Sequence, residues 1–250
     1  MPKITLNISE EKKISINKFI SETGFCSRRE ADKLILSGRV TIDGSAAKSG
    51  NRVTREQVVT IDGDLLKIKE KAVYIAFNKP YGISSTTDLK DKSNIIKFIA
   101  HPTRIFPIGR LDKDSEGLIL LTNDGDIVNK VLRAGNNHEK EYIVTVDKPI
   151  TQDFVKKMSG GITILGKITK TCFVKQEQRN IFRIILVQGL NRQIRRMCLV
   201  LGYQVKRLVR IRIMNITLKD ISPGHWRDLS TEEILKLNEL TRFSIKTSHH

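Results

Sequence analysis

The segment from Gly109 to Gly125 constrains this chain more than any other part of its sequence. It is G-R-L-D-K-D-S-E-G-L-I-L-L-T-N-D-G, a polar loop between two glycines that runs into an apolar stretch and ends in an Asn-Asp-Gly turn. The pattern predicts a buried strand that holds a carboxylate-bearing loop at a surface, as a catalytic acid requires. Asp112 is the candidate acid. An isolated aspartate between glycines is more often an ordinary turn carboxylate. The rest of the chain therefore has to show which of these Asp112 is.

Length and composition favour a folded protein. With 250 residues, of which 39% are hydrophobic, the chain can form one large domain, or a small domain joined to a medium one. No apolar run is long enough to cross a bilayer, and the first residues lack the apolar core of a signal peptide. We therefore expect a cytoplasmic protein without a membrane partner.

The cysteines and histidines indicate no metal site. Cys26, Cys172 and Cys198 are far apart, odd in number and form no C-x-x-C pair, which argues against a disulfide framework and a structural zinc site. No histidine pair has the i, i+4 spacing beside a glutamate that a zinc enzyme uses. The sequence predicts no metal and no cofactor.

The formal net charge of +17 predicts a polyanionic partner, most often nucleic acid. A generally basic surface for solubility would explain the sign, but not the local exclusion of carboxylates between residues 192 and 212. That stretch has no acidic residue, and its basic residues are Arg192, Arg195, Arg196, Lys206, Arg207, Arg210 and Arg212.

The first part of the chain has the pattern of a small separate module. Apolar spacing predicts a helix over 15–23, and Ser27 and Glu30 form a capping box for a second helix that ends near Gly38. Strand-like pieces at 39–42 and 58–61 each lead into Asp-Gly.

The remainder is richer in strands, which do not alternate strictly with helices, so we expect an α+β domain with a mixed, mainly antiparallel sheet. The predicted boundaries are 1–62 for the module, 63–72 for a linker, 73–240 for the main domain and 241–250 for a tail. Strands are expected at 73–78, 117–122, 141–146, 181–187 and 211–217, and helices at 126–133, 151–159, 191–201 and 230–240.

The module resembles an S4 RNA-binding domain over residues 14–62. The most specific part of this resemblance is S-R-R-E-A-D-K-L-I-x-x-G-R-V, which begins at Ser27. It implies that Arg28, Arg29 and Arg39 contact RNA. A basic helical cap without an RNA role is the alternative.

The main domain contains five motifs, in order, that resemble those of bacterial ribosomal RNA pseudouridine synthases. Besides G-R-L-D at Gly109, they are N-K-P-Y-G at Asn78, K-E-Y at Lys140, G-L-N-R-Q-I-R-R-M at Gly189 and G-H-W-R-D-L at Gly224. Five motifs in the family's order exceed what coincidence explains. The resemblance implies a small S4-like domain joined to a catalytic domain of pseudouridine synthase fold.

The resemblance also implies roles for individual residues. Asp112 is the catalytic aspartate, Arg195 the guanidinium that keeps it ionised, and Tyr142 the aromatic against the target base. Leu186 packs under the base, and Arg110 occupies or holds open the space that the flipped base vacates. Other roles stay open: phosphate contacts for Arg110 and Arg195, a sheet-face aromatic for Tyr142 and ordinary core for Leu186.

The reaction fits these residue types. Converting uridine to pseudouridine breaks the N1–C1′ bond, turns the base and joins C5 to C1′, so no atom is gained or lost and no cofactor is required. A carboxylate near the ribose has to act as nucleophile or base.

The expected substrate is a uridine in a stem-loop of 23S rRNA, extruded from its stack by a monomeric enzyme. A non-catalytic S4-type RNA-binding or ribosome assembly protein is the alternative, as is the same chemistry on 16S rRNA or tRNA. An RNA methyltransferase is disfavoured because no G-x-G occurs. The residues expected to bind RNA in this domain, besides Arg110 and Leu186, are Arg192, Arg196, Lys206, Arg207 and Arg210.

Overall fold

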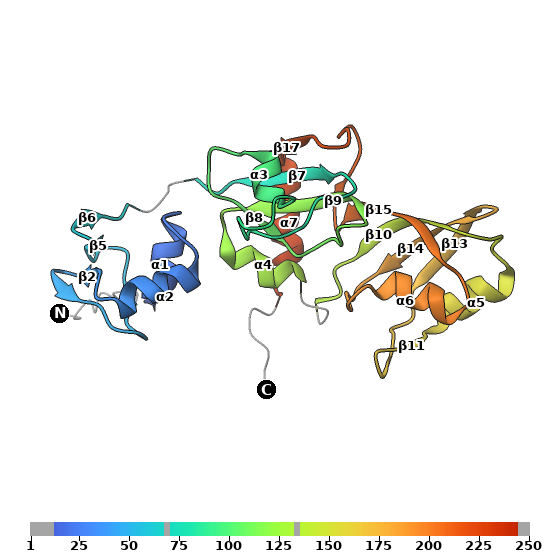
Figure 1. Ribbon diagram of the computed structural model, residues 1–250, viewed down its shortest axis with the longest axis horizontal. Helices are drawn as coiled ribbons and strands as arrows, with labels where there is room; N and C mark the ends of the chain where they lie inside the picture. Colours follow the sequence, from blue (N-terminus) through green and yellow to red (C-terminus); the bar gives the residue numbers. More distant parts are fainter. Residues whose placement is uncertain (1–12, 68–70, 133–135, 245–250) are drawn as a thin grey trace, which may run out of the picture. The chain divides into compact units, whose positions relative to one another are not determined.

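The computed structural model describes residues 13–67, 71–132 and 136–244 (Figure 1). The chain divides into two compact units, with the boundary between Ala72 and Val73. Within the described residues, no helix has the length and apolar character needed to span a membrane. The predicted tail lies outside the described residues from position 245 onward.

Two short helices form one layer of the first unit. They are α1 (Ile16–Glu22) and α2 (Arg28–Leu36). The predicted capping box is confirmed, because the Ser27 hydroxyl accepts from the Glu30 amide and the Glu30 carboxylate accepts from the Ser27 amide. Ile16, Phe19 and Ile20 of α1 are buried with Ala31 and Ile35 of α2 in the core of this unit. These residues form the inward faces of the two helices.

The strands of the first unit are short. Both predicted Asp-Gly pairs adopt left-handed backbone conformations that reverse the chain. The second reversal, at Asp62-Gly63, produces a strand at Asp64–Leu65, so the prediction of a linker from residue 63 is wrong. The pairs are β1 (Ile14–Ser15) with β4 (Arg52–Val53), and a sheet of order β3 (Ser45–Ala46), β2 (Val40–Ile42), β5 (Val59–Ile61) and β6 (Asp64–Leu65).

A nine-stranded sheet organises the second unit (Figure 1). Every pair in it is antiparallel except β9 with β15, which confirms the prediction of a mixed, mainly antiparallel sheet. The order is β13 (Phe173–Gln178), β14 (Ile181–Leu186), β10 (Lys140–Val146), β15 (Val205–Ile213), β9 (Glu116–Thr122), β7 (Tyr74–Lys79) and β17 (Trp226–Asp228), with β8 (Phe106–Ile108) on β9 and β16 (Ile216–Thr217) on β15.

The prediction of a strand over 211–217 is wrong. Strand β15 begins at Val205 and ends at Ile213, Met214 takes a left-handed conformation, and β16 runs back along β15. The apolar pattern continues through this turn, which contains neither glycine nor proline, so no sequence signal marks the end of the strand.

The predicted helices are all present, with small shifts of their ends. The capping box that Ser230 forms with Glu233 is confirmed. Sequence reasoning missed α3 and β13, which are short or face solvent, and a small hairpin. The helices are α3 (Ile95–Ile99), α4 (Gly125–Leu132), α5 (Gln152–Gly160), α6 (Gln193–Val200) and α7 (Thr231–Thr241), and the hairpin strands are β11 (Thr163–Ile164) and β12 (Lys167–Ile168).

Helices cover the two halves of this sheet differently. Helices α5 and α6 pack on one face of β10 and β14, whereas α4 and α7 pack on one face of β7 and β9 and α3 packs on the other (Figure 1). The halves join at the parallel pair β9–β15, which has only two residue pairs, Glu116 with Val209 and Gly117 with Arg210. The loop that carries Asp112 enters β9 at this junction.

Candidate active site

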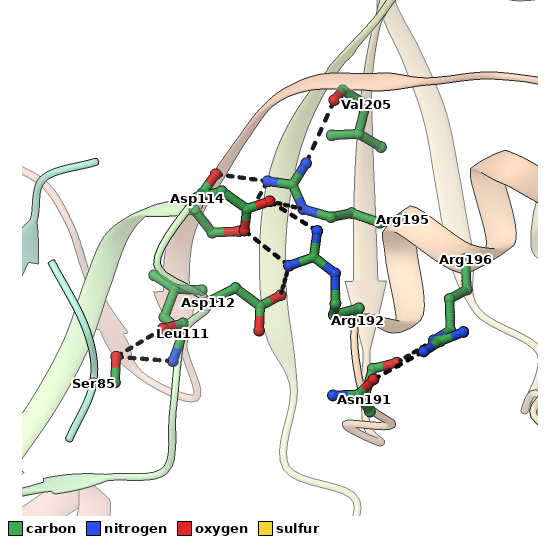
Figure 2. Close-up of polar contacts among 10 residues, drawn as sticks. Ser85, Leu111, Asp112, Asp114, Asn191, Arg192, Arg195, Arg196 and Val205 are labelled. Atoms are coloured by element: carbon green, nitrogen blue, oxygen red, sulfur yellow. Dashed lines mark hydrogen bonds and ion pairs between the residues drawn. The ribbon is translucent and has the colours of Figure 1, made fainter. Parts of the chain in front are cut away.

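The loop between Gly109 and Gly117 is fixed along its backbone. The carbonyl oxygens of residues 110 to 114 each accept a hydrogen bond, so the loop has little freedom to move. In chain order the donors are Nη1 of Arg210 at 3.5 Å, Oγ of Ser85 at 2.8 Å, the amide of Ser115 at 3.0 Å, the amide of Gly82 at 2.9 Å and Nη2 of Arg195 at 2.6 Å. Figure 2 shows the contacts of Ser85 and Arg195.

Gly117 permits the loop to join the sheet. Its φ is +100°, and a Cβ at this position would lie 2.3 Å from the carbonyl oxygen of Arg210. No side chain fits at that distance, so only glycine allows β9 to approach β15 here. The second glycine of the motif is thus required by packing.

Asp112 presents its carboxylate at the surface of this loop, with the side chain 39% exposed. Its Oδ2 lies 3.6 Å from Nη1 of Arg192, the residue that precedes α6 (Figure 2). The expectation that Arg195 is the ion-pair partner of Asp112 needs correction, because among the described residues that contact comes from Arg192.

Arg195 is instead anchored beside the loop. Its Nη2 donates to the carbonyl oxygen of Asp114 at 2.6 Å and to Oγ of Ser115 at 3.2 Å, and its Nη1 donates to the carbonyl oxygen of Val205 at 3.4 Å. The side chain is 15% exposed. One turn of α6 separates the two arginines, which is why the same helix end supplies both.

Asp114 accepts from both arginines. Nη1 and Nη2 of Arg192 donate to its two carboxylate oxygens at 3.0 and 2.8 Å, and Nε of Arg195 lies 3.5 Å from Oδ2 (Figure 2). The hydrogen bonds from Arg192, with the charge of Arg195, hold the pKa of Asp114 below its usual value. Sequence reasoning did not single out Asp114, although it lies two residues after Asp112.

An apolar floor lies beneath the loop. Tyr142 and Leu186 belong to one buried cluster with Leu111, which precedes Asp112, and Ile194, which precedes Arg195. The structure therefore places the predicted Tyr142 and Leu186 in the buried cluster that also contains the sequence neighbours of Asp112 and Arg195. An aromatic ring with an aliphatic side chain can pack against the flat face of a base.

Two lysines that sequence reasoning did not single out are buried near the loop. Lys79 of β7 is fully buried, and its Nζ donates to the carbonyl oxygens of Pro80 and Ile83 at 3.0 and 2.7 Å. Burial lowers the pKa of Lys79 and that of Lys140 to about 8, and the charge of Arg210 contributes in both cases. The available signal was a lysine directly beside a predicted strand, at the end of 73–78 for Lys79 and at the start of 141–146 for Lys140.

The predicted RNA-binding residues of this unit divide by environment. Lys206 and Arg110 are exposed, Arg207 pairs with Glu116 at 2.6 Å, and Arg196 binds Asn191 at 3.1 Å. Arg210 does not lie on a surface where RNA could contact it, contrary to the prediction. Its side chain is 4% exposed and its Nε donates to the carbonyl oxygen of Leu118 at 2.6 Å.

In the first unit, Arg28 and Arg29 are exposed on α2, where the chemistry suits a phosphate backbone. Arg39 is also exposed but forms an ion pair with Asp62, which raises the pKa of Arg39. It is therefore less available to RNA than the α2 pair.

Comparison with known proteins decides the family. The RNA pseudouridylate synthase family matches residues 73–199, and the S4 domain matches residues 15–59. A dual-specificity RNA pseudouridine synthase, RluF of Escherichia coli strain K12, is 56% identical over 92% of this chain and 80% of its own length. The chain belongs to the RNA pseudouridine synthase family. It is thus an isomerase that forms pseudouridine in RNA.

Other pseudouridine synthases agree over nearly the whole chain. An uncharacterized RNA pseudouridine synthase of Aquifex aeolicus is 38% identical over 90% of this chain and 93% of its own length. A crystal structure of a pseudouridylate synthase has a TM-score of 0.67 at 30% identity, covering 90% of this chain and 99% of that one. The predicted fold, an S4 domain joined to a pseudouridine synthase domain, is confirmed.

Proposed function

We propose that this pseudouridine synthase modifies a uridine in a stem-loop of 23S rRNA, with Asp112 as the catalytic carboxylate. The observation that carries this proposal is the loop itself, in which the carbonyls of residues 110 to 114 are all hydrogen-bonded while the Asp112 side chain stays accessible. We further propose that the enzyme is a monomer in the cytoplasm and requires no metal or cofactor.

The choice of RNA is supported by relatives. A Bacillus subtilis relative, 33% identical over 90% of this chain, is named ribosomal large subunit pseudouridine synthase B. The E. coli relative is named a dual-specificity enzyme, which favours a second RNA class beside rRNA, and tRNA is the first to test.

The proposed chemistry assigns one role to each site residue. In one route Asp112 attacks C1′ as the N1–C1′ bond breaks, and C5 then displaces the carboxylate from C1′. In the other route Asp112 removes a proton from the ribose as the N1–C1′ bond breaks, and returns it when C5 joins C1′. In both routes C5 loses its proton and N1 gains one. Tyr142 and Leu186 hold the detached base as it turns. Arg195 fixes the loop, and Arg110 supports the RNA after the base has flipped.

RNA is held by exposed cations on both units. Arg28 and Arg29 of the S4 domain, with a smaller contribution from Arg39, contact the phosphate backbone. In the second unit, near the active site, RNA contacts Lys206, Arg192, Arg196 and Arg207. Apart from Arg192, which also lies beside Asp112, these residues take no part in breaking a bond.

Complementation tests the proposal directly. Pseudouridines in 23S rRNA, 16S rRNA and tRNA would be mapped by carbodiimide modification and primer extension in cells that lack the gene and carry wild type, Asp112→Asn or Asp153→Asn. Asp153 pairs with Lys157 on the surface of α5, which makes Asp153→Asn a matched control. We expect one 23S stop to be absent with Asp112→Asn and present with the other two proteins.

Three outcomes would contradict parts of this proposal. A stop that persists with Asp112→Asn would remove the catalytic role of Asp112. Loss of only a 16S stop would retain the chemistry and overturn the choice of subunit. If no stop depended on the gene, the protein would bind RNA without modifying it, and the S4-type binding protein would be the better description.

A further inference from the structure

The backbone of Arg192 is held in an unfavourable conformation. Its φ and ψ are 49° and 37°, in the left-handed region, and its side chain makes no capping contact with α6. This region is sterically unfavourable for a residue with a Cβ, so other contacts have to hold Arg192 there. The contacts that hold Arg192 in this conformation therefore indicate its role.

Asp114 supplies those contacts. Both terminal nitrogens of Arg192 donate to its carboxylate in a two-point pair at 3.0 and 2.8 Å, the strongest geometry available to a guanidinium. The same residue accepts Nη2 of Arg195 through its backbone carbonyl at 2.6 Å. One aspartate therefore sets the orientation of both arginines.

Arg192 is at the same time shared with Asp112. Its Nη1 lies 3.0 Å from Oδ1 of Asp114 and 3.6 Å from Oδ2 of Asp112, so the stronger contact is with Asp114 (Figure 2). The guanidinium faces Asp112 with one nitrogen and leaves the other oxygen of that carboxylate without an arginine contact among the described residues.

We propose that Asp114 is a positioning residue, which holds Arg192 beside Asp112 and prevents it from closing on that carboxylate in a two-point pair. This inference rests on the proposed catalytic role of Asp112. A nucleophile or base needs an oxygen that can reach the ribose, and a two-point pair with Arg192 would occupy both oxygens of Asp112.

Other charges near Asp112 do not replace Asp114. Lys79 is buried and donates to backbone carbonyls, and Arg195 is anchored on the backbone of Asp114 and Val205. Glu116 is the next carboxylate along the chain, but it pairs with Arg207. Asp114 is thus the carboxylate that retains Arg192.

A double-mutant cycle tests this role. Single-turnover rates would be measured with a saturating 23S rRNA stem-loop for wild type, Asp114→Asn, Arg192→Gln and the double variant, with Asp153→Asn as control. We expect Asp114→Asn to lower the rate about 10- to 100-fold while the Kd for RNA changes less than threefold. In the Arg192→Gln background, Asp114→Asn should change the rate less than threefold, because its effect passes through Arg192 while the backbone carbonyls of Asp114 and Val205 still anchor Arg195.

A wild-type rate for Asp114→Asn, or independent effects of the two substitutions, would overturn the inference. If Asp114→Asn did not fold by thermal unfolding, Arg192→Gln would decide, since it should also slow the rate at least tenfold and a wild-type rate would contradict the proposal. Asp112→Asn in the same assay distinguishes a failure of the proposed function from a failure of the positioning role. An active Asp112→Asn refutes the proposed function, whereas an inactive Asp112→Asn beside an unimpaired Asp114→Asn refutes only the positioning role.

Discussion

Two pairs of adjacent arginines, one at the start of a helix in each unit, have opposite surroundings. Arg28 and Arg29 begin α2 with exposed side chains, and Arg28 contacts only Asn17 among the hydrogen bonds that the described residues show. Arg195 and Arg196 on α6 are partly buried, and Arg195 binds the loop of Asp112. A similar pair of arginines is thus exposed to solvent in one unit and makes internal contacts in the other.

The difference changes how the net charge should be interpreted. Between residues 192 and 212, several cations that suggested a nucleic-acid surface are paired with carboxylates from elsewhere in the chain. The carboxylates that pair with these cations therefore come from other parts of the chain, which folding brings next to this stretch. The carboxylate pairs are Arg192 with Asp112 and Asp114, Arg195 with Asp114, Arg207 with Glu116, and Arg212 with Glu139 and Glu141.

The largest expected effect comes from Arg195. Arg195→Gln should lower kcat about 100-fold, because the hydrogen bonds to Asp114 and Ser115 are removed and Asp112 shifts relative to the ribose. Arg183→Gln is the matched control. Arg183 also pairs with two carboxylates, Glu141 and Glu177, but it is paired with Ile143 across the sheet, on the face opposite Tyr142. Equal losses of kcat in the two variants would show that Arg195 acts through general stability.

The second effect concerns stability and compares Arg210 with Arg207. Arg210→Gln should reduce the free energy of unfolding by roughly 2–3 kcal/mol, because the buried carbonyl of Leu118 loses its donor and a cavity opens. Arg207→Gln should change it by less than about 0.5 kcal/mol, since its pair with Glu116 is on the surface. Urea unfolding of both variants measures the difference. Similar values would mean that Arg210 is not a structural residue.

The family and most helices could be predicted from the sequence, but the partners of the arginines could not. The motifs identified the family, and spacing with capping boxes located α1, α2 and α7. Partners could not be predicted, because Arg192 meets Asp114 and Arg210 meets Leu118 only after strands far apart in the chain have paired. The short parallel pair of β9 with β15, which creates these contacts, has no local signal in the sequence.

The third effect tests the exposed pair. Arg28→Gln with Arg29→Gln should weaken the Kd for the rRNA stem-loop about tenfold and reduce the slope of log K against log salt by about 1 for each phosphate that the variant no longer binds. Single-turnover rates at saturating RNA should stay within threefold of wild type. Arg39→Gln should have a smaller effect on Kd, because Arg39 is already paired with Asp62. An unchanged salt slope for the double variant would remove α2 from the RNA path.

The smallest effect concerns Lys140. Among the described residues, it belongs neither to the solvent-exposed cations nor to those paired with carboxylates. It is 8% exposed, its Nζ donates to the carbonyl oxygen of His138 at 3.3 Å, and no carboxylate pairs with it within the described ranges. Burial, together with the charge of Arg210, lowers the pKa of Lys140 from 10.5 to about 8. Folding therefore opposes the charged form of Lys140.

The sign of the pH dependence follows from this lowered pKa. Between pH 8 and 10.5 the unfolded chain keeps a proton on Lys140 that the folded protein has released, so the contribution of this residue to stability rises with pH across that window. Relative to Lys140→Met, wild type should gain roughly 1 kcal/mol of unfolding free energy between pH 8.5 and pH 9.5. Urea unfolding of both proteins at the two pH values measures this gain. A constant difference between wild type and Lys140→Met would mean that Lys140 keeps its proton in the folded protein. Lys140 would then be better solvated than its exposed fraction indicates.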